Sequence, residues 1–329
     1  MRGRLTTAGV VVEVACARPA AEASLRAATD GLWSDGAEGD PAEVQITIES
    51  SSDPFDIAGW EPLTRGAWCH DGAVVLRDAC GSGYDLAVRA GSGHLEVRAR
   101  WRPPLKTRAA ATLLRGRADL LARAALLQYP ALWWSGVHGR VPVHAPALEL
   151  DGVTVLLAGP GGVGKSTVIL SEVARGARVT SDNLSVTDGT TVAGVVEPAK
   201  ITGGTGARRA HGRRESHLPG RTDALVPTEA WAVRRDGRAE AELEDCDAGS
   251  VARDLTAGTY MAGELRRYWA FAATLALGTG RGPASPPVAD VAARLCAALP
   301  CRTLRLGRTV PGSLAELRST RPVLTVATR

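Results

Sequence analysis

Apolar and polar residues alternate in short runs through the first hundred positions, and this pattern is typical of half-buried β-strands. The strands expected from it are Thr7–Cys16, Val44–Glu49, Ala73–Leu76, Tyr84–Ala90 and His94–Trp101. The last two flank Gly91-Ser92-Gly93, which predicts a hairpin. A helix is expected over Ala20–Leu32. Residues 1–104 are therefore predicted to form a small α+β module.

The pattern changes after Pro103 and Pro104, which interrupt the chain. Thr107–Gln128 is rich in Ala, Leu and Arg, and several of its leucines recur at roughly helical spacing. This predicts a long helix that ends before Pro130, since a helix interior does not tolerate proline. Residues 105–135 are expected to link the first module to a second domain, residues 136–329.

The second domain alternates predicted strands and helices, and Asp151-Gly152 and Asp188-Gly189 are typical of tight turns between paired strands. The expected strands are Val141–Leu150, Val153–Ala158, Ala177–Ser181, Leu184–Thr187, Thr191–Val196, Thr303–Leu306 and a pair, Ala224–Arg234 with Arg238–Glu244. The expected helices are Gly164–Arg175, Gly249–Thr256, Tyr260–Leu277 and Val288–Leu299. This order predicts an α/β domain.

One segment of this domain carries a complete phosphate-binding pattern. Gly159-Pro-Gly-Gly-Val-Gly-Lys-Ser166 satisfies G-x-x-x-x-G-K-[ST] between a hydrophobic strand and a helix. The glycines let backbone N–H groups converge on phosphate oxygens, and the helix N-terminus adds partial positive charge. Lys165 is expected to reach the β- and γ-phosphates, and Ser166 to bind Mg²⁺. The sequence thus predicts a P-loop for ATP and Mg²⁺, made by Gly159, Gly161, Gly162, Val163, Gly164, Lys165, Ser166 and Thr167.

An acidic residue ends the next predicted strand. A carboxylate at this position, Asp182, can face the metal ion or the γ-phosphate, although it could also cap a turn. Asn183 follows it, and an amide can orient a water or a substrate but cannot accept a proton as a base does.

Charge and composition exclude some classes of protein. The chain has 39 basic and 35 acidic residues, and a net charge of +4 is too small to indicate nucleic-acid binding. No apolar run approaches the roughly 18 residues of a membrane span. Glu13 interrupts the apolar run near the N-terminus, so a first strand is preferred there to a signal peptide. The six cysteines form no C-x-x-C pair and are expected to be reduced thiols of a cytoplasmic protein.

From His138-Gly139 to Asn183, the chain resembles the catalytic core of HPr kinase/phosphorylase, and it is most similar to the HPr-kinase-like enzymes of peptide tailoring. The shared features are the His-Gly pair, a strand pair, the P-loop, a helix that ends in Arg-Gly and a strand that ends at Asp182. The resemblance implies that Asp182 accepts the hydroxyl proton of the acceptor, with His138 beside it, and that Lys165 binds phosphate. Ser166 and Asp182 would be the metal ligands.

Two departures from the family are visible. Asn183 stands where the family has a second aspartate, which would weaken metal binding or phosphorolysis. Pro219-Gly220-Arg221 is similar to part of a family element, but Thr222 stands where that element has asparagine.

A basic, glycine-rich loop covers Ile201–Arg221. Its arginines are Arg208, Arg209, Arg213, Arg214 and Arg221. One interpretation is a solvated loop, and another is a lid whose arginines close over phosphates or hold an acidic substrate. Nucleic-acid binding is less favoured, because no aromatic residues lie between these arginines.

The expected fold is therefore α/β, a P-loop kinase core of the HPr kinase type with a smaller N-terminal α+β module. The expected function is ATP-dependent transfer of the γ-phosphate to a Ser or Thr hydroxyl of a peptide or protein, such as a ribosomally made precursor peptide. The resemblance also implies a homo-oligomer. Two alternatives stay open, namely a small-metabolite P-loop kinase and a nucleotide-binding scaffold or switch without transferase activity.

Overall fold

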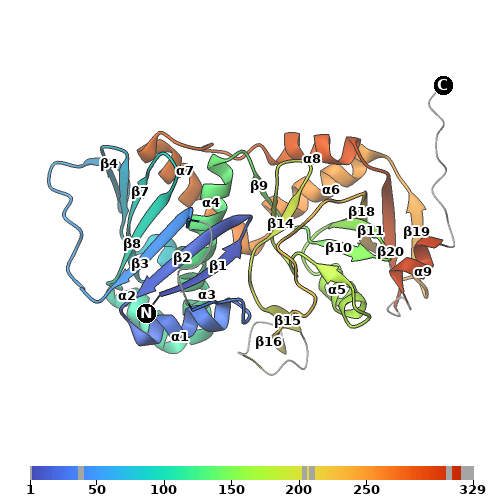
Figure 1. Ribbon diagram of the computed structural model, residues 1–329, viewed down its shortest axis with the longest axis horizontal. Coiled ribbons are helices and arrows are strands. Elements are labelled where there is room, and N and C mark those ends of the chain that lie inside the picture. The colour runs from blue at the N-terminus through green and yellow to red at the C-terminus, as the bar shows by residue number, and fades with distance from the viewer. Residues whose placement is uncertain (1, 36–40, 202–205, 207–211, 309–312, 320–329) are drawn as a thin grey trace.

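Strands of the chain form four separate sheets within the part that the computed structural model describes, residues 2–35, 41–201, 206, 212–308 and 313–319. The molecule is elongated, with the largest sheet toward one end and a six-stranded sheet toward the other (Figure 1). Helices lie around and between the sheets (Figure 1). This is a mixed α/β architecture.

The first hundred residues build an eight-stranded sheet, in the order β1-β2-β3-β8-β7-β6-β5-β4. Its pairs are antiparallel except β2–β3 and β3–β8, which are parallel. Its elements are β1 (Arg2–Thr7), β2 (Val10–Cys16), α1 (Pro19–Ala28), β3 (Val44–Glu49), β4 (Glu61–Thr64), β5 (Ala67–His70), β6 (Ala73–Leu76), the short helix η1 (Ala79–Gly81), β7 (Tyr84–Ala90) and β8 (Leu95–Trp101). The alternating residues Val10, Val12 and Val14 of β2 are buried, as the sequence pattern predicts.

The helical segment that follows differs from its prediction. It is divided into α2 (Leu105–Leu113), α3 (Arg115–Arg123), the π-helix η2 (Ala124–Gln128) and α4 (Tyr129–Val137). The predicted end before Pro130 is wrong, because this proline lies in the first turn of α4, where its missing N–H has no helical partner to lose. Trp133 and Trp134 of α4 are buried, as expected of core residues.

The remaining chain builds a six-stranded sheet in the order β12-β10-β11-β18-β20-β19, a four-stranded sheet in the order β17-β14-β13-β9, and the pair β15-β16. The strands are β9 (Val141–Val143), β10 (Ala147–Leu150), β11 (Val153–Ala158), β12 (Arg178–Val179), β13 (Ser185–Thr187), β14 (Val192–Gly194), β15 (Ala199–Ile201), β16 (Arg214–Ser216), β17 (Ala224–Leu225), β18 (Glu229–Arg235), β19 (Glu242–Asp245) and β20 (Cys301–Leu306). The helices are α5 (Lys165–Val173), α6 (Ala248–Tyr260), the 3-10 helix η4 (Gly263–Leu265), α7 (Tyr268–Thr279), α8 (Val288–Ala297) and α9 (Leu314–Ser319).

Two predicted strand arrangements are wrong. The predicted strand Val141–Leu150 is two strands in different sheets, since Pro146 between them has no N–H to donate to a ladder. β18 and β19 are not neighbours, because β20 lies between them and pairs with both. In contrast, β13 and β14 pair directly across Asp188-Gly189, as predicted.

The larger apolar core crosses the predicted boundary at residue 104. It joins residues of the eight-stranded sheet to α4, to Leu184 and Val195 near the four-stranded sheet, and to Leu265 and Phe271.

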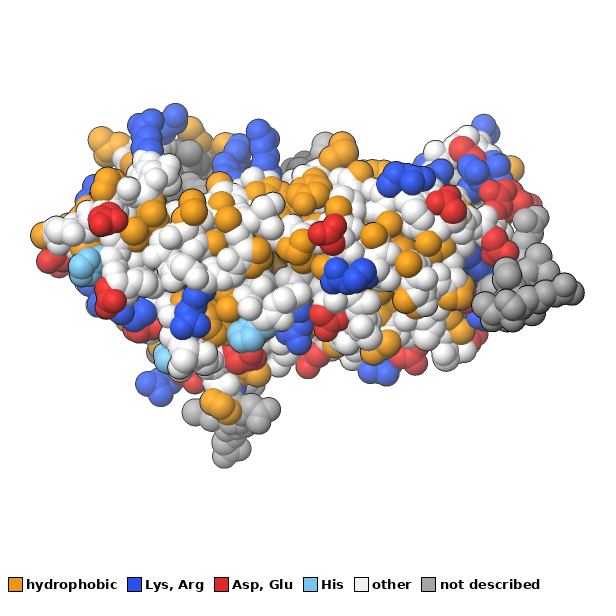
Figure 2. All heavy atoms as spheres, turned by 90° about the horizontal axis from the view of Figure 1, so that it is seen from above, with side chains coloured by type: hydrophobic (Ala, Val, Ile, Leu, Met, Phe, Trp, Pro, Cys, Tyr) orange, Lys and Arg blue, Asp and Glu red, His pale blue; other side chains and the backbone are white. Residues whose placement is uncertain are grey.

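No helix in the described ranges has both the length and the apolar character needed to span a bilayer. Seen from above, basic and acidic side chains are scattered among apolar ones on the described part of that face (Figure 2).

Candidate functional site

The glycine-rich segment 159–164 connects β11 to α5 in a tightly enclosed position. Gly159 and Gly164 have φ values of +145° and +118°, which side chains rarely adopt. A Cβ atom on Gly159 would lie 2.8 Å from the carbonyl oxygen of Val233 on β18. A Cβ atom on Gly258 of α6 would lie 2.7 Å from the carbonyl oxygen of Gly159. The loop is therefore held between β18 and α6 at distances that only glycine allows.

Lys165 begins α5 and turns its side chain back into this loop. Its Nζ atom donates to the carbonyl oxygens of Gly159 at 2.6 Å and Pro160 at 3.1 Å. Burial lowers the pKa of Lys165 to about 8, although the carboxylates of Asp182 and Glu264 act in the opposite direction. An ammonium group enclosed by carbonyl oxygens at a helix N-terminus is suited to polyphosphate binding.

A cavity of about 320 Å³ opens over the loop and brings most of the predicted site residues together. Its lining includes the predicted residues Gly161, Gly162, Gly164, Lys165, Ser166, Thr167 and Asp182. Asn183, Arg213, Arg235 and Glu264 also line it. Gly159 is buried and Val163 packs against the apolar core, so these two shape the loop without lining the cavity.

Asp182 follows β12 and is 4% exposed. Its Oδ2 atom accepts the backbone N–H of Lys200 at 3.3 Å, whereas Oδ1 has no hydrogen-bond partner among the described residues. Asp182 belongs to the same cavity lining as Ser166. A carboxylate and a hydroxyl, completed by phosphate oxygens and waters, are oxygen ligands that Mg²⁺ accepts, so these two residues fit the predicted metal site.

The structure does not bring His138 to this cavity. His138 ends α4 with an exposed side chain, and its Nδ1 atom lies 2.9 Å from the carbonyl oxygen of Trp134. The histidine beside the cavity is His144, which is 6% exposed and whose Nε2 atom lies 2.6 Å from Oδ1 of Asn183. Sequence reasoning missed His144, and its only local signal is a titratable residue within an otherwise apolar run.

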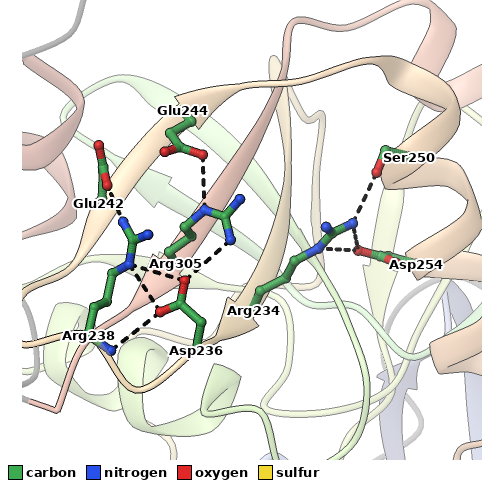
Figure 3. A network of polar contacts seen from close by, with 8 residues as sticks. All are labelled: Arg234, Asp236, Arg238, Glu242, Glu244, Ser250, Asp254 and Arg305. Carbon is green, nitrogen blue, oxygen red and sulfur yellow. Dashed lines mark hydrogen bonds and ion pairs between the residues drawn. The ribbon is translucent and has the colours of Figure 1, made fainter.

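Two arginines line the same cavity without a side-chain partner among the described residues, namely Arg213 and Arg235. The residue before Arg235 has contacts of a different kind. Arg234 bonds to Asp254 at 2.9 Å and Ser250 at 3.0 Å on α6, as Figure 3 shows. Adjacent side chains of a strand point to opposite faces, so Arg235 projects away from that network. The other ion pairs of the network join Asp236, Arg238, Glu242, Glu244 and Arg305 (Figure 3).

The remaining arginines of the basic segment have different surroundings. Arg208 and Arg209 lie outside the described residues. Arg214 reaches the carbonyl oxygen of Gly206 at 3.3 Å and does not line the cavity. Arg221 pairs with Asp30 at 3.3 Å, with both side chains buried, so it serves packing between distant parts of the chain.

No family model matches the chain, and no curated protein matches it. Among solved structures, an HPr(Ser) kinase/phosphatase from Coxiella burnetii is similar over 29% of this chain and 65% of that chain, at 18% sequence identity and a TM-score of 0.23. The likeness therefore spans slightly less than two thirds of that protein, and a score this low does not establish a shared fold.

Proposed function

We propose that this protein is an ATP-dependent phosphotransferase that transfers the γ-phosphate to a Ser or Thr hydroxyl of a peptide or protein. One observation carries the proposal: most residues of the glycine-rich phosphate loop line a single cavity together with the buried Asp182, which has one carboxylate oxygen unpartnered among the described residues. Phosphoryl transfer to an alcohol needs these two features, a site for the phosphates and a base for the hydroxyl proton.

In the proposed reaction, the loop amides and Lys165 bind the phosphates of ATP. Mg²⁺, held by Ser166 and Asp182, would neutralise phosphate charge. The hydroxyl oxygen of the acceptor forms a bond to the γ-phosphorus, and its proton passes to Asp182. The bond between the γ-phosphorus and the bridging oxygen breaks, and its electron pair leaves with ADP.

The surrounding residues have supporting roles in this proposal. Arg213 and Arg235 add positive charge to the cavity lining, where the three terminal phosphate oxygens carry negative charge. Neutral His144 holds the amide of Asn183, next to the base, through its hydrogen bond of 2.6 Å. The site thus combines fixed phosphate-binding charges with one positioned carboxylate.

The test combines calorimetry with Mg-ATP and mass spectrometry of a Ser- and Thr-containing peptide library incubated with Mg-ATP. Asp182→Asn should bind Mg-ATP but transfer phosphate about 10²- to 10⁴-fold more slowly, the usual contribution of a general base. Asp223→Asn makes the same charge change at an exposed position and is the matched control.

Three results would contradict the proposal. If Mg-ATP does not bind, the proposed nucleotide site is wrong. If Asp182→Asn transfers phosphate at a near-normal rate, Asp182 is not the base. Phosphorylation of a sugar or nucleoside in place of every peptide would support the metabolite kinase, whereas ATP binding with no acceptor of any class would support the scaffold or switch.

A further inference from the structure

A second cavity, of about 270 Å³, adjoins the candidate active site. The two cavities share Gly263 and Glu264 of η4 in their linings. The second cavity lies where distant parts of the chain meet, because Ala28 of α1, the α3–η2 segment, Glu197 and Lys200 all line it. It therefore lies next to the candidate active site, and none of the proposed phosphate-binding residues lines it.

A chain of polar contacts connects the second cavity to Asp182. Lys200, in the lining of the second cavity, donates its backbone N–H to Oδ2 of Asp182 at 3.3 Å. The Nζ atom of Lys200 lies 3.2 Å from a carboxylate oxygen of Glu197 and 3.2 Å from one of Glu264. Lys200 and the shared Glu264 thus connect the second cavity to the carboxylate proposed as the base.

The lining contains a buried acceptor with unused capacity. Glu197 is 6% exposed, and its Oε1 atom has no hydrogen-bond partner among the described residues. Burial raises the pKa of Glu197, against the opposing effect of Lys200. Such an atom is costly to bury unless a ligand donates a hydrogen bond to it, and a peptide N–H or a hydroxyl can do so.

Two guanidinium groups at the cavity also lack partners within the part of the chain that the structure describes. Arg117 and Arg267 line the second cavity and a neighbouring one of about 520 Å³ along α2 and α3. No ion pair or side-chain hydrogen bond of either arginine occurs among the described residues. By contrast, Arg123 in the same lining lies 2.7 Å from Glu215. The free positive charge of this cavity is therefore concentrated at Arg117 and Arg267, beside the apolar Leu121.

We propose, on the basis of the function proposed above, that the second cavity binds the acceptor as a peptide segment with an acidic residue near the phosphorylated Ser or Thr. The hydroxyl side chain enters past Glu264 to Asp182, and the acidic side chain pairs with Arg117 and Arg267. The adjoining π-helix η2 is consistent with this role, because π-helical segments occur frequently at functional sites.

The experiment uses the full chain, Mg-ATP and a peptide library with a fixed Ser and randomised flanking positions, and it identifies phosphorylated peptides by mass spectrometry. The wild-type protein should select Asp or Glu at one or more flanking positions. Arg117→Ala and Arg267→Ala should each raise the KM for an acidic peptide about tenfold, the loss expected for one charge-assisted hydrogen bond. Arg267→Glu should reverse the preference toward Lys or Arg. Mg-ATP affinity, measured by calorimetry, should stay unchanged in all three variants.

Arg108→Ala is the matched control, because Arg108 lies on α2 and lines neither cavity. Phosphorylation without acidic selection, or selection unaltered by the three variants, overturns the second cavity as acceptor site and leaves the kinase proposal in place. Mg-ATP binding without phosphorylation of any library peptide also overturns it. Absence of Mg-ATP binding overturns the kinase proposal itself, and the acceptor site with it.

Discussion

The Nε2 atom of His144 lies 2.6 Å from Oδ1 of Asn183, the residue that follows Asp182. An amide oxygen can only accept a hydrogen bond, so His144 donates from Nε2. Burial and the positive charge of Lys165 lower the pKa of His144 to about 4, which keeps its ring neutral near pH 7. The contact therefore holds the amide of Asn183 beside the candidate base.

The first prediction concerns this contact. His144→Ala should reduce phosphate transfer about tenfold to a hundredfold, because it leaves the half-buried amide of Asn183 without its partner, and should change Mg-ATP affinity little. His144→Gln should recover part of the rate, since its amide N–H can donate. His138→Ala, at an exposed histidine outside the cavity, should behave as wild type. Steady-state kinetics of the three variants separates the two histidines, and a larger rate loss for His138→Ala would reverse the assignment.

The second prediction concerns pH. Burial lowers the pKa of Lys165 to about 8, and a bound polyphosphate should raise it again by favouring the charged ammonium. At pH 7 Lys165 is mostly charged both before and after Mg-ATP binds, so the protein takes up few protons on binding. Above about pH 8 the free protein has lost this proton, so binding takes it up and Mg-ATP affinity falls as the pH rises.

Calorimetry in two buffers with different ionisation enthalpies measures this uptake directly. Lys165→Arg supplies the control, because arginine stays charged throughout this range and should remove the uptake. Equal proton uptake in wild type and Lys165→Arg would show that another group titrates.

The third prediction compares adjacent arginines. Arg213 lines the cavity over the glycine-rich loop, whereas Arg214 contacts the carbonyl oxygen of Gly206. Arg213→Glu should weaken Mg-ATP binding or slow turnover about tenfold or more, since it places negative charge beside the phosphates. Arg214→Glu should stay close to wild type in both quantities. Equal effects of the two substitutions would mean that the segment acts only through its overall charge.

The fourth prediction concerns stability. Arg123 and Glu215 form an ion pair of 2.7 Å in which both side chains are less than one-tenth exposed. Arg123→Ala should lower the free energy of unfolding by about 3–5 kcal/mol, because it leaves a carboxylate buried without this cation. Arg89→Ala removes the exposed pair with Asp71 and should cost at most about 1 kcal/mol. Urea denaturation of both variants measures the two losses in the free energy of unfolding. Similar losses would mean that burial does not increase the contribution of the Arg123–Glu215 pair to stability.

The features that the sequence predicted correctly are those that follow from local patterns of residues. Alternation located β2, β3, β6, β7 and β8 of the eight-stranded sheet but not β1, β4 and β5. The glycine-rich motif lies between a strand and a helix, as the pattern required. Ser166 and Asp182, the predicted metal ligands, line one cavity, and their binding of a metal ion stays a prediction. These features depend on neighbours in the chain, which a sequence displays directly.

The features that the sequence did not predict depend on contacts between distant residues. His144 reaches the cavity because β9 and β10 belong to different sheets, which turns the connecting residues toward Asn183. Glu264 lies in a short 3-10 helix that interrupts the helix expected over Tyr260–Leu277. β20 enters the sheet between β18 and β19, an order that strand propensity does not encode. The division of the chain at residue 104 stays a prediction.

The core that joins the eight-stranded sheet to α4, Leu265 and Phe271 has a consequence for folding. Strands near the N-terminus and helices from the last third of the chain bury the same apolar surface, so neither can complete its packing before the other has been synthesised. Newly made N-terminal strands would therefore leave the ribosome with exposed apolar side chains, and they would depend on chaperones until α7 emerges.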